Sequence, residues 1–181
     1  MRRMKKRKSS WIDIKKVIKA FEPSDLVSLV KDLYQLSEEN MRFLNARYAD
    51  DGETYKRYKK IISKCLCPDV LGQSDDFDFK RAKKTISDFA KATGDDERTT
   101  DLMIYFVECG NQFTLDYGDI NEVFYDTLIE MYEKTVDRVR KMQKNKQESF
   151  RKRLEKIMKS SDGIGWGYHD DLCYFYYEAF Q

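Results

Sequence analysis

The sequence contains few residues that interrupt helices, with only two prolines and eight glycines in 181 residues. Proline breaks a helix interior and glycine weakens it, so this scarcity predicts a chain that is mostly helical. No run of 18 apolar residues occurs, which predicts no membrane-spanning helix. The basic start leads into an amphipathic segment rather than a continuous apolar one, so no secretory signal is predicted either.

Histidine and cysteine are also scarce. A single histidine, His169, cannot build a multi-histidine metal site. Cys65 and Cys67 are too close in sequence for the usual zinc-ligand pair, and Cys109 and Cys173 lie far away. Burial in the core is the favoured interpretation of these cysteines, because free cysteine is commonly buried. Without a secretory signal, four cysteines predict a reducing, cytoplasmic location. No metal or other cofactor is predicted.

Charge is unevenly distributed along the chain. The 34 Lys and Arg residues outnumber the 32 Asp and Glu residues by two, but six of them lie within the first eight positions. These six are Arg2, Arg3, Lys5, Lys6, Arg7 and Lys8. The remaining 28 basic residues face 32 acidic ones, a net charge of −4. We predict a disordered basic arm over residues 1–9 and a single helical domain over residues 10–181.

Apolar residues recur at helical spacing throughout residues 10–181, and no strand-like alternation extends beyond a few residues. The pattern predicts an all-α fold of eight or nine helices, arranged as an irregular bundle or as HEAT-like stacked helix pairs. Gly110 is predicted to end one helix before an aromatic loop at 112–118, and Trp166 to be buried. The predicted core consists of Leu29, Leu33, Leu44, Ile61, Ile86, Phe89, Ile104, Phe124, Leu128 and Met131.

Two acidic clusters resemble catalytic groups. Asp119 and Glu122 stand three residues apart, and His169 is followed by Asp170. If these clusters converged, they could serve a metal-dependent hydrolase or nuclease-like enzyme, with His169 as a general base. The simpler interpretation is structural. Asp119 and Glu122 have the spacing of a helix-capping box, and Asp170 suits the positive end of a helix dipole.

The segment 134–159 is rich in basic residues, with eleven Lys and Arg against three Asp and Glu, and Glu133 directly before it. Together with the basic arm, it makes a nucleic-acid backbone a candidate partner. The candidate contacts are the six arm residues together with Arg140, Lys141, Arg151 and Lys152. No base-reading motif is present, so such binding would depend on phosphate contacts and hence on salt. An ordinary solvated helix face explains the same pattern.

Several segments resemble a family of small bacterial all-helical proteins of unknown function. The resemblance runs over residues 23–171 and includes Leu-Val-Lys-Asp-Leu-Tyr at 29–34 and Asn-Met-Arg-Phe-Leu-Asn-Ala-Arg-Tyr at 40–48. Its most specific pieces are Tyr-Gly-Asp-Ile at 117–120 and Ile-Gly-Trp-Gly at 164–167. The resemblance implies a bacterial, cytosolic, helical protein and carries no catalytic residues.

The absence of a specific catalytic motif favours a non-enzymatic binding module or adaptor that engages a protein or a nucleic acid. The alternative remains the hydrolase built on Asp119, Glu122, His169 and Asp170. The aromatic segment 174–180 is a further candidate for contact with a partner, because four consecutive aromatic residues cannot all lie on one face of a helix.

Overall fold

The computed structural model describes residues 10–49, 52–68 and 77–180, and within them all regular structure is helical. The all-α prediction is therefore confirmed. The predicted basic arm at 1–9 lies outside the described residues. The helices are α1 (Trp11–Ile18), α2 (Pro23–Leu36), α3 (Glu38–Tyr48), α4 (Glu53–Leu66), α5 (Phe79–Thr93), α6 (Asp96–Tyr117), α7 (Glu122–Arg140), α8 (Lys144–Ser160) and α9 (Tyr168–Phe180). None of these helices is both long enough and apolar enough to cross a membrane.

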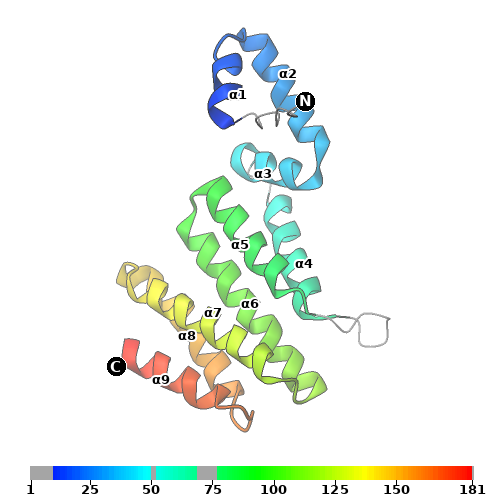
Figure 1. The fold of residues 1–181 in the computed structure, drawn as a ribbon. Coiled ribbons are helices and arrows are strands. Elements are labelled where there is room, and N and C mark those ends of the chain that lie inside the picture. Colours follow the sequence, from blue (N-terminus) through cyan, green and yellow to red (C-terminus); the bar gives the residue numbers. More distant parts are fainter. Residues whose placement is uncertain (1–9, 50–51, 69–76, 181) are drawn as a thin grey trace, which may run out of the picture.

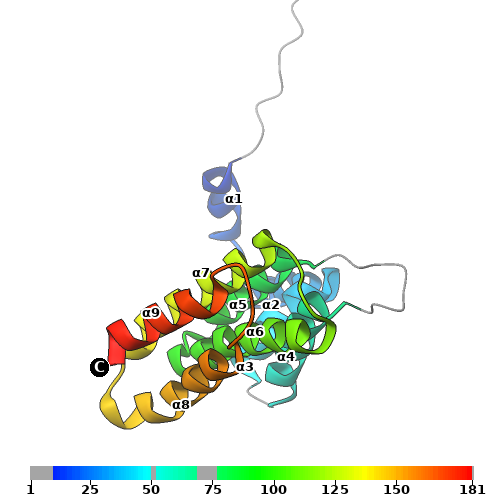
Figure 2. The same cartoon turned by 90° about the horizontal axis from the view of Figure 1, so that it is seen from below.

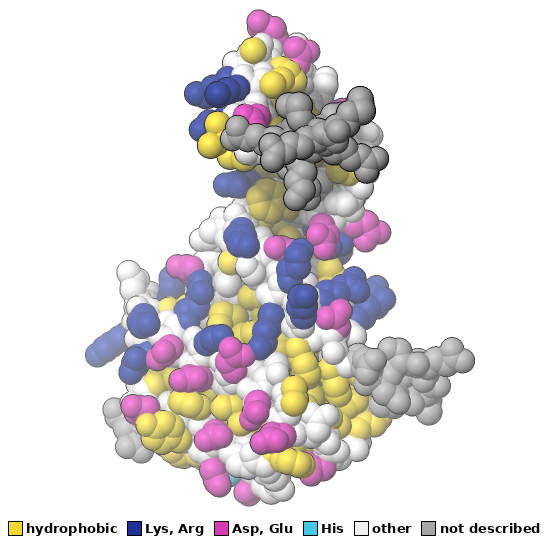
Figure 3. All heavy atoms as spheres, in the orientation of Figure 1, with side chains coloured by type: hydrophobic (Ala, Val, Ile, Leu, Met, Phe, Trp, Pro, Cys, Tyr) yellow, Lys and Arg dark blue, Asp and Glu magenta, His cyan; other side chains and the backbone are white. Residues whose placement is uncertain are grey.

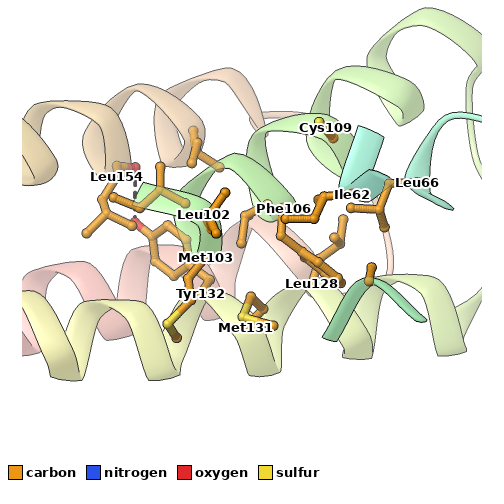
Figure 4. Close-up of a cluster of buried hydrophobic side chains, with 14 of the residues drawn as sticks. Ile62, Leu66, Leu102, Met103, Phe106, Cys109, Leu128, Met131, Tyr132 and Leu154 are labelled. Carbon is orange, nitrogen blue, oxygen red and sulfur yellow. Dashed lines mark hydrogen bonds between the residues drawn. The ribbon is translucent and has the colours of Figure 1, made fainter. Parts of the chain in front are cut away.

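Helix α6 is the centre of a six-helix body formed by α4–α9 (Figures 1 and 2). It packs against α4, α5, α7 and α8, while α9 covers α7 and α8. Figure 4 shows labelled side chains of α4, α6, α7 and α8 meeting in one cluster, among them Leu66, Phe106 and Leu128. In the same cluster, the Tyr132 hydroxyl donates a hydrogen bond of 3.1 Å to the carbonyl of Leu154. The phenol is thus satisfied inside the core, as a buried polar group requires.

Gly110 lies in the middle of α6 and directly against α7. A Cβ added at this position would lie 2.4 Å from Leu128 Cδ2, so the missing side chain lets the two helices approach closely. The prediction that Gly110 ends a helix is wrong, because here the glycine serves interhelical packing rather than a turn. The predicted loop at 112–118 is also wrong up to Tyr117. Instead Phe113 and Thr114 extend the buried face of α6.

The start of α7 also differs from the prediction. The side chain of Asn121 caps the helix by accepting a hydrogen bond of 3.0 Å from the backbone N–H of Phe124. Asp119 therefore is not the cap, and its carboxylate bonds elsewhere. Oδ1 accepts from the Tyr125 hydroxyl at 2.8 Å, and Oδ2 accepts from the indole N–H of Trp166 at 2.9 Å.

Trp166 joins two loops at the surface of the body and is not buried, contrary to the prediction. Its side chain is 53% exposed, and its ring stacks at 6.5 Å from the ring of Tyr125. With Asp119 it connects segments 117–120 and 164–167, the two most specific pieces of the family resemblance. The hydrogen bond from the indole N–H to Asp119 holds the loop at the surface, so the ring does not have to enter the core.

Helices α1–α3 form an extension on one end of the body (Figure 1). Helix α3 packs against α4 and α5, and α2 packs against α3. None of the residues of these three helices is fully buried. Of the predicted core, Leu33 is 43% exposed, and Leu29, Leu44 and Ile61 are only partly covered. The other six predicted core residues are buried.

We predict that Gly110→Ala destabilises the protein by about 1–3 kcal/mol, the usual cost of forcing extra volume into a packed core. This effect opposes the gain of up to about 1 kcal/mol that alanine offers within a helix. Chemical denaturation would measure the change. Gly165→Ala is the matched control, because no heavy atom lies within 4 Å of its added Cβ. Equal stability of the two variants would show that α6 and α7 do not require the close approach.

We also predict that Trp166→Ala lowers the free energy of unfolding by about 1.5–3 kcal/mol, the range for losing one hydrogen bond to a charged group. A fully buried tryptophan would cost about 3–5 kcal/mol. Trp166→Phe keeps the ring but removes the N–H, so it should reproduce most of the loss in urea unfolding. A Trp166→Phe variant as stable as the parent would show that the bond to Asp119 contributes nothing.

Candidate functional site

The first two helices of the extension and the turn between them expose many large apolar side chains, which we call together the α1–α2 apolar surface. Figure 3 shows apolar side chains at the surface of this part of the molecule. The surface consists of Trp11, Ile12, Ile14, Val17, Phe21, Leu26, Val27, Val30, Leu33 and Leu36, all of them exposed by more than a third. Monomeric proteins rarely leave apolar patches of this extent uncovered unless the patch binds something.

The local sequence explains why these two helices form and why their apolar residues gather. Ser10 and Asp13 make a capping box at the start of α1, and Pro23 occupies the first position of α2. In each helix the apolar residues recur at intervals of three and four, which places most of them on one face. Within the described chain, α3 packs on α2 but no helix packs substantially on α1, so much of both faces stays open to solvent.

The rim of the α1–α2 apolar surface is basic on the α1 side. Lys15, Lys16 and Lys19 are exposed, and Asp13 is the only acidic residue of that helix. The carboxylate of Asp13 is occupied by the N-terminal cap, where hydrogen bonds from the backbone and hydroxyl of Ser10 lower its pKa. The six basic residues of positions 2–8 precede this helix in the sequence. This end of the chain therefore combines apolar area with positive charge.

Asp119 and Glu122 do not form a reactive pair. Asp119 is engaged by Tyr125 and Trp166, and both bonds link loops of the body. Glu122 lies exposed in the first turn of α7, where a carboxylate favours the positive end of the helix dipole. Both residues thus have structural roles that account for their positions.

His169 is held from both sides of its ring, and neither Asp170 nor Asp171 orients it. Its Nδ1 lies 2.9 Å from Ser161 Oγ and 3.2 Å from the carbonyl of Met158, and its Nε2 lies 3.4 Å from Cys173 Sγ. Because Ser161 Oγ itself donates to the Met158 carbonyl, Nδ1 carries the ring hydrogen and Nε2 accepts from the thiol. The histidine therefore ties the end of α8 to α9.

The convergence that the hydrolase alternative requires is not seen in the described chain. Among residues 10–49, 52–68 and 77–180, no group of three or more His, Cys, Asp or Glu side chains could hold a metal ion. Asp170 is exposed in the first turn of α9 and has no role in positioning His169.

The basic segment 134–159 divides into the end of α7 and the whole of α8, and acidic neighbours neutralise much of its charge. Seven of its eleven cations form salt bridges, among them Arg140 with Asp137 at 3.0 Å and Lys152 with Glu148 at 3.1 Å. Arg151 instead lies over the ring of Phe180, 5.4 Å from its centroid. Lys141 lines a shallow surface hollow with Asp96 and Glu97. The predicted basic face is therefore a mixed-charge face.

Arg153 is the most constrained of these cations. It bonds Glu108 through two nitrogens, at 2.8 and 2.7 Å, and also contacts Asp101. Burial lowers the pKa of Arg153, but the hydrogen bonds to the two carboxylates outweigh it and raise the pKa overall. Such fork-shaped pairing is geometrically specific and ties α8 to α6. This guanidinium is thus occupied within the protein and is a poor candidate for phosphate binding.

A cleft of about 460 Å³ opens between the end of α4, α6 and α8. Asn111 of α6 lines it and is only 4% exposed. Its Nδ2 donates to Ser160 Oγ at 2.9 Å, and Ser160 in turn donates to the Ile157 carbonyl, which fixes the orientation of the amide. Among the described residues, Asn111 Oδ1 then has no hydrogen-bond partner. A buried acceptor without a partner is uncommon and marks this cleft as a second candidate site.

Sequence reasoning missed three of these features. Leu33 of α2 had been assigned to the core and no surface role was predicted for the other apolar residues of α1 and α2, because periodicity shows that a face exists but not what covers it. Asn111 and Arg153 had no motif around them. Cys67 and Cys109, which line the same cleft, stand 42 positions apart, so their proximity depends on how α4 packs against α6.

In comparisons with known proteins, no family model, no curated protein and no solved structure matches this chain. The resemblance to a family of small bacterial helical proteins therefore stays a prediction from residues 23–171. Two features of the chain itself are candidate functional sites, the α1–α2 apolar surface and the α4–α6–α8 cleft.

Proposed function

We propose that the protein is a non-enzymatic binding module that engages a partner protein through the α1–α2 apolar surface. One observation carries this proposal: α1, α2 and the turn between them present ten large apolar side chains that are exposed by more than a third. Burying one such side chain fully is worth about 1.5–3 kcal/mol, so a partner that covered several of them would gain substantial affinity.

The charge around this surface indicates the chemistry of the partner. Lys15, Lys16 and Lys19 border the apolar side chains, and the basic residues of positions 2–8 precede them. A complementary partner presents an apolar groove with an acidic rim. A second copy of the chain fits less well, because an isologous contact would bring the same basic surface together twice.

A nucleic-acid partner receives less support from the described residues. Phosphate contacts require accessible cations, whereas most of those in α7 and α8 are paired with carboxylates of the same chain. A phosphate backbone also gains nothing from the large apolar side chains of α1 and α2. A protein partner accounts for both the apolar area and the charge.

The test compares Val27→Glu on α2 with Val123→Glu on α7, which are matched because the two valines are 70% and 67% exposed. We expect both variants to keep the parent's helical content and unfolding free energy, since neither side chain is buried. Val27→Glu should weaken the isolated complex at least 10-fold, which corresponds to about 1.4 kcal/mol. Val123→Glu should bind like the parent.

The full-length chain and both variants would be purified from the cells that make the protein, with and without nuclease treatment, and any complex would be measured by light scattering. Equal loss or equal retention of the partner in both variants would overturn the proposal. So would a complex that nuclease dissolves, or a partner that is a second copy of the chain.

A further inference from the structure

The α4–α6–α8 cleft contains two cysteines whose surroundings differ. Cys67 follows the last residue of α4 and is exposed, whereas Cys109 is buried within α6. Cys67 Sγ lies 3.9 Å from the backbone carbonyl oxygen of Cys109, to which the Cys67 thiol can donate a weak hydrogen bond, so the two cysteines are neighbours in the cleft. Both residues line the cleft, so a small molecule that enters it reaches Cys67.

The structure assigns Cys67 and Cys109 as a redox-active dithiol, in which a hydroperoxide or hydrogen peroxide converts the two thiols into an intramolecular disulfide. The inference is independent of the α1–α2 apolar surface. It concerns a modification site at the opposite end of α4 and requires no partner protein.

The two thiols differ in the way that such a reaction needs. A hydrogen bond from the Cys109 thiol lowers the pKa of Cys67 to about 7, against the opposing effects of burial and of the Asp116 carboxylate. The same hydrogen bond and the burial of Cys109 raise the pKa of that thiol. Near neutral pH, Cys67 is therefore the thiolate that attacks, and Cys109 keeps its proton.

Other polar and charged groups around the cleft determine the electrostatic environment of Cys67. Tyr105, Glu108 and Asp116 face Cys67 from α6, and Arg153 and Lys156 face it from α8. Glu108 and Arg153 neutralise one another through their salt bridge of 2.7 Å. Asn111, whose buried Oδ1 has no hydrogen-bond partner among the described residues, lines the same cleft.

The reaction balances in two steps. The Cys67 thiolate attacks one oxygen of hydrogen peroxide, the O–O bond breaks, and the departing hydroxide takes up a proton to give water. Cys67 is then a sulfenic acid. The sulfur of Cys109 attacks the sulfur of Cys67, the S–O bond breaks, and the hydroxide leaves as water with the proton of Cys109. The two thiols lose two electrons, and the peroxide is reduced to two molecules of water.

Peptide mapping of the full-length protein tests the assignment directly. Trypsin cleaves after Lys64 and Lys80 and so places Cys65 and Cys67 in one peptide, whereas Cys109 lies in the peptide 99–134. After mild treatment with hydrogen peroxide, we expect these two peptides to be joined by a disulfide. The Cys65→Ala variant should give the same cross-link, and the Cys67→Ala variant should lose it.

Alkylation by iodoacetamide supplies a measurement that needs no oxidation. We expect the rate at Cys67 to rise with a midpoint near pH 7 in the parent, and near the ordinary thiol value of about 8.5 in Cys109→Ala. The internal control is Cys173, whose pKa is raised mainly by burial.

Three results would overturn the inference. The first is a cross-link that survives Cys67→Ala, and the second is oxidation that joins only separate chains or only Cys173. The third is a Cys67 alkylation midpoint no lower than that of Cys173. Circular dichroism of each variant shows whether it is folded, and the folded Cys65→Ala variant identifies Cys67 as the cysteine joined to Cys109.

Discussion

The close approach of α6 and α7 at Gly110 and Leu128 is the constraint on which the body depends. Helix α6 is covered by four other helices, so its distance from α7 determines how the remaining side chains interlock. A side chain at position 110 would occupy the volume that Leu128 fills. Once this contact forms, α8 and α9 pack on α7, and Arg153 bonds to the carboxylates of α6. The candidate cleft is a consequence of the same packing, since α6 forms one of its walls.

The body and the extension differ in how fully neighbouring helices cover their apolar faces. In the body, apolar stripes are buried by neighbouring helices, and polar atoms such as the Tyr132 hydroxyl find partners in the core. In the extension, stripes of the same kind stay exposed because α3 offers them little cover. The difference lies in the number of helices that surround each stripe, not in the stripes themselves. A binding role for the extension and a chemical role for the cleft are therefore separable, and each has its own residues.

Much of the fold was predictable from the sequence, and the candidate sites were not. Helical spacing correctly indicated an all-α chain, the last helix and most of the central core, because periodicity reflects local geometry. The errors in the predicted helix ends and caps arose at residues whose type suits more than one structural role. Gly110 was interpreted as a helix end although it serves packing, and Asp119 as a cap although it bonds Trp166. Charge counting along 134–159 also misled, because several of its cations are neutralised by carboxylates of α6, which lie far away in the sequence.

The sequence by itself determined the helical class, the positions of most helices and the concentration of positive charge near its start, all of which depend on neighbouring residues. The tertiary structure decided which apolar faces are covered, which cations are paired and which cysteines meet. The physical reason is that burial and pairing are set by contacts between residues far apart in the chain. Cys67 and Cys109 stand 42 positions apart, and only the packing of α4 on α6 brings their sulfurs to the same cleft.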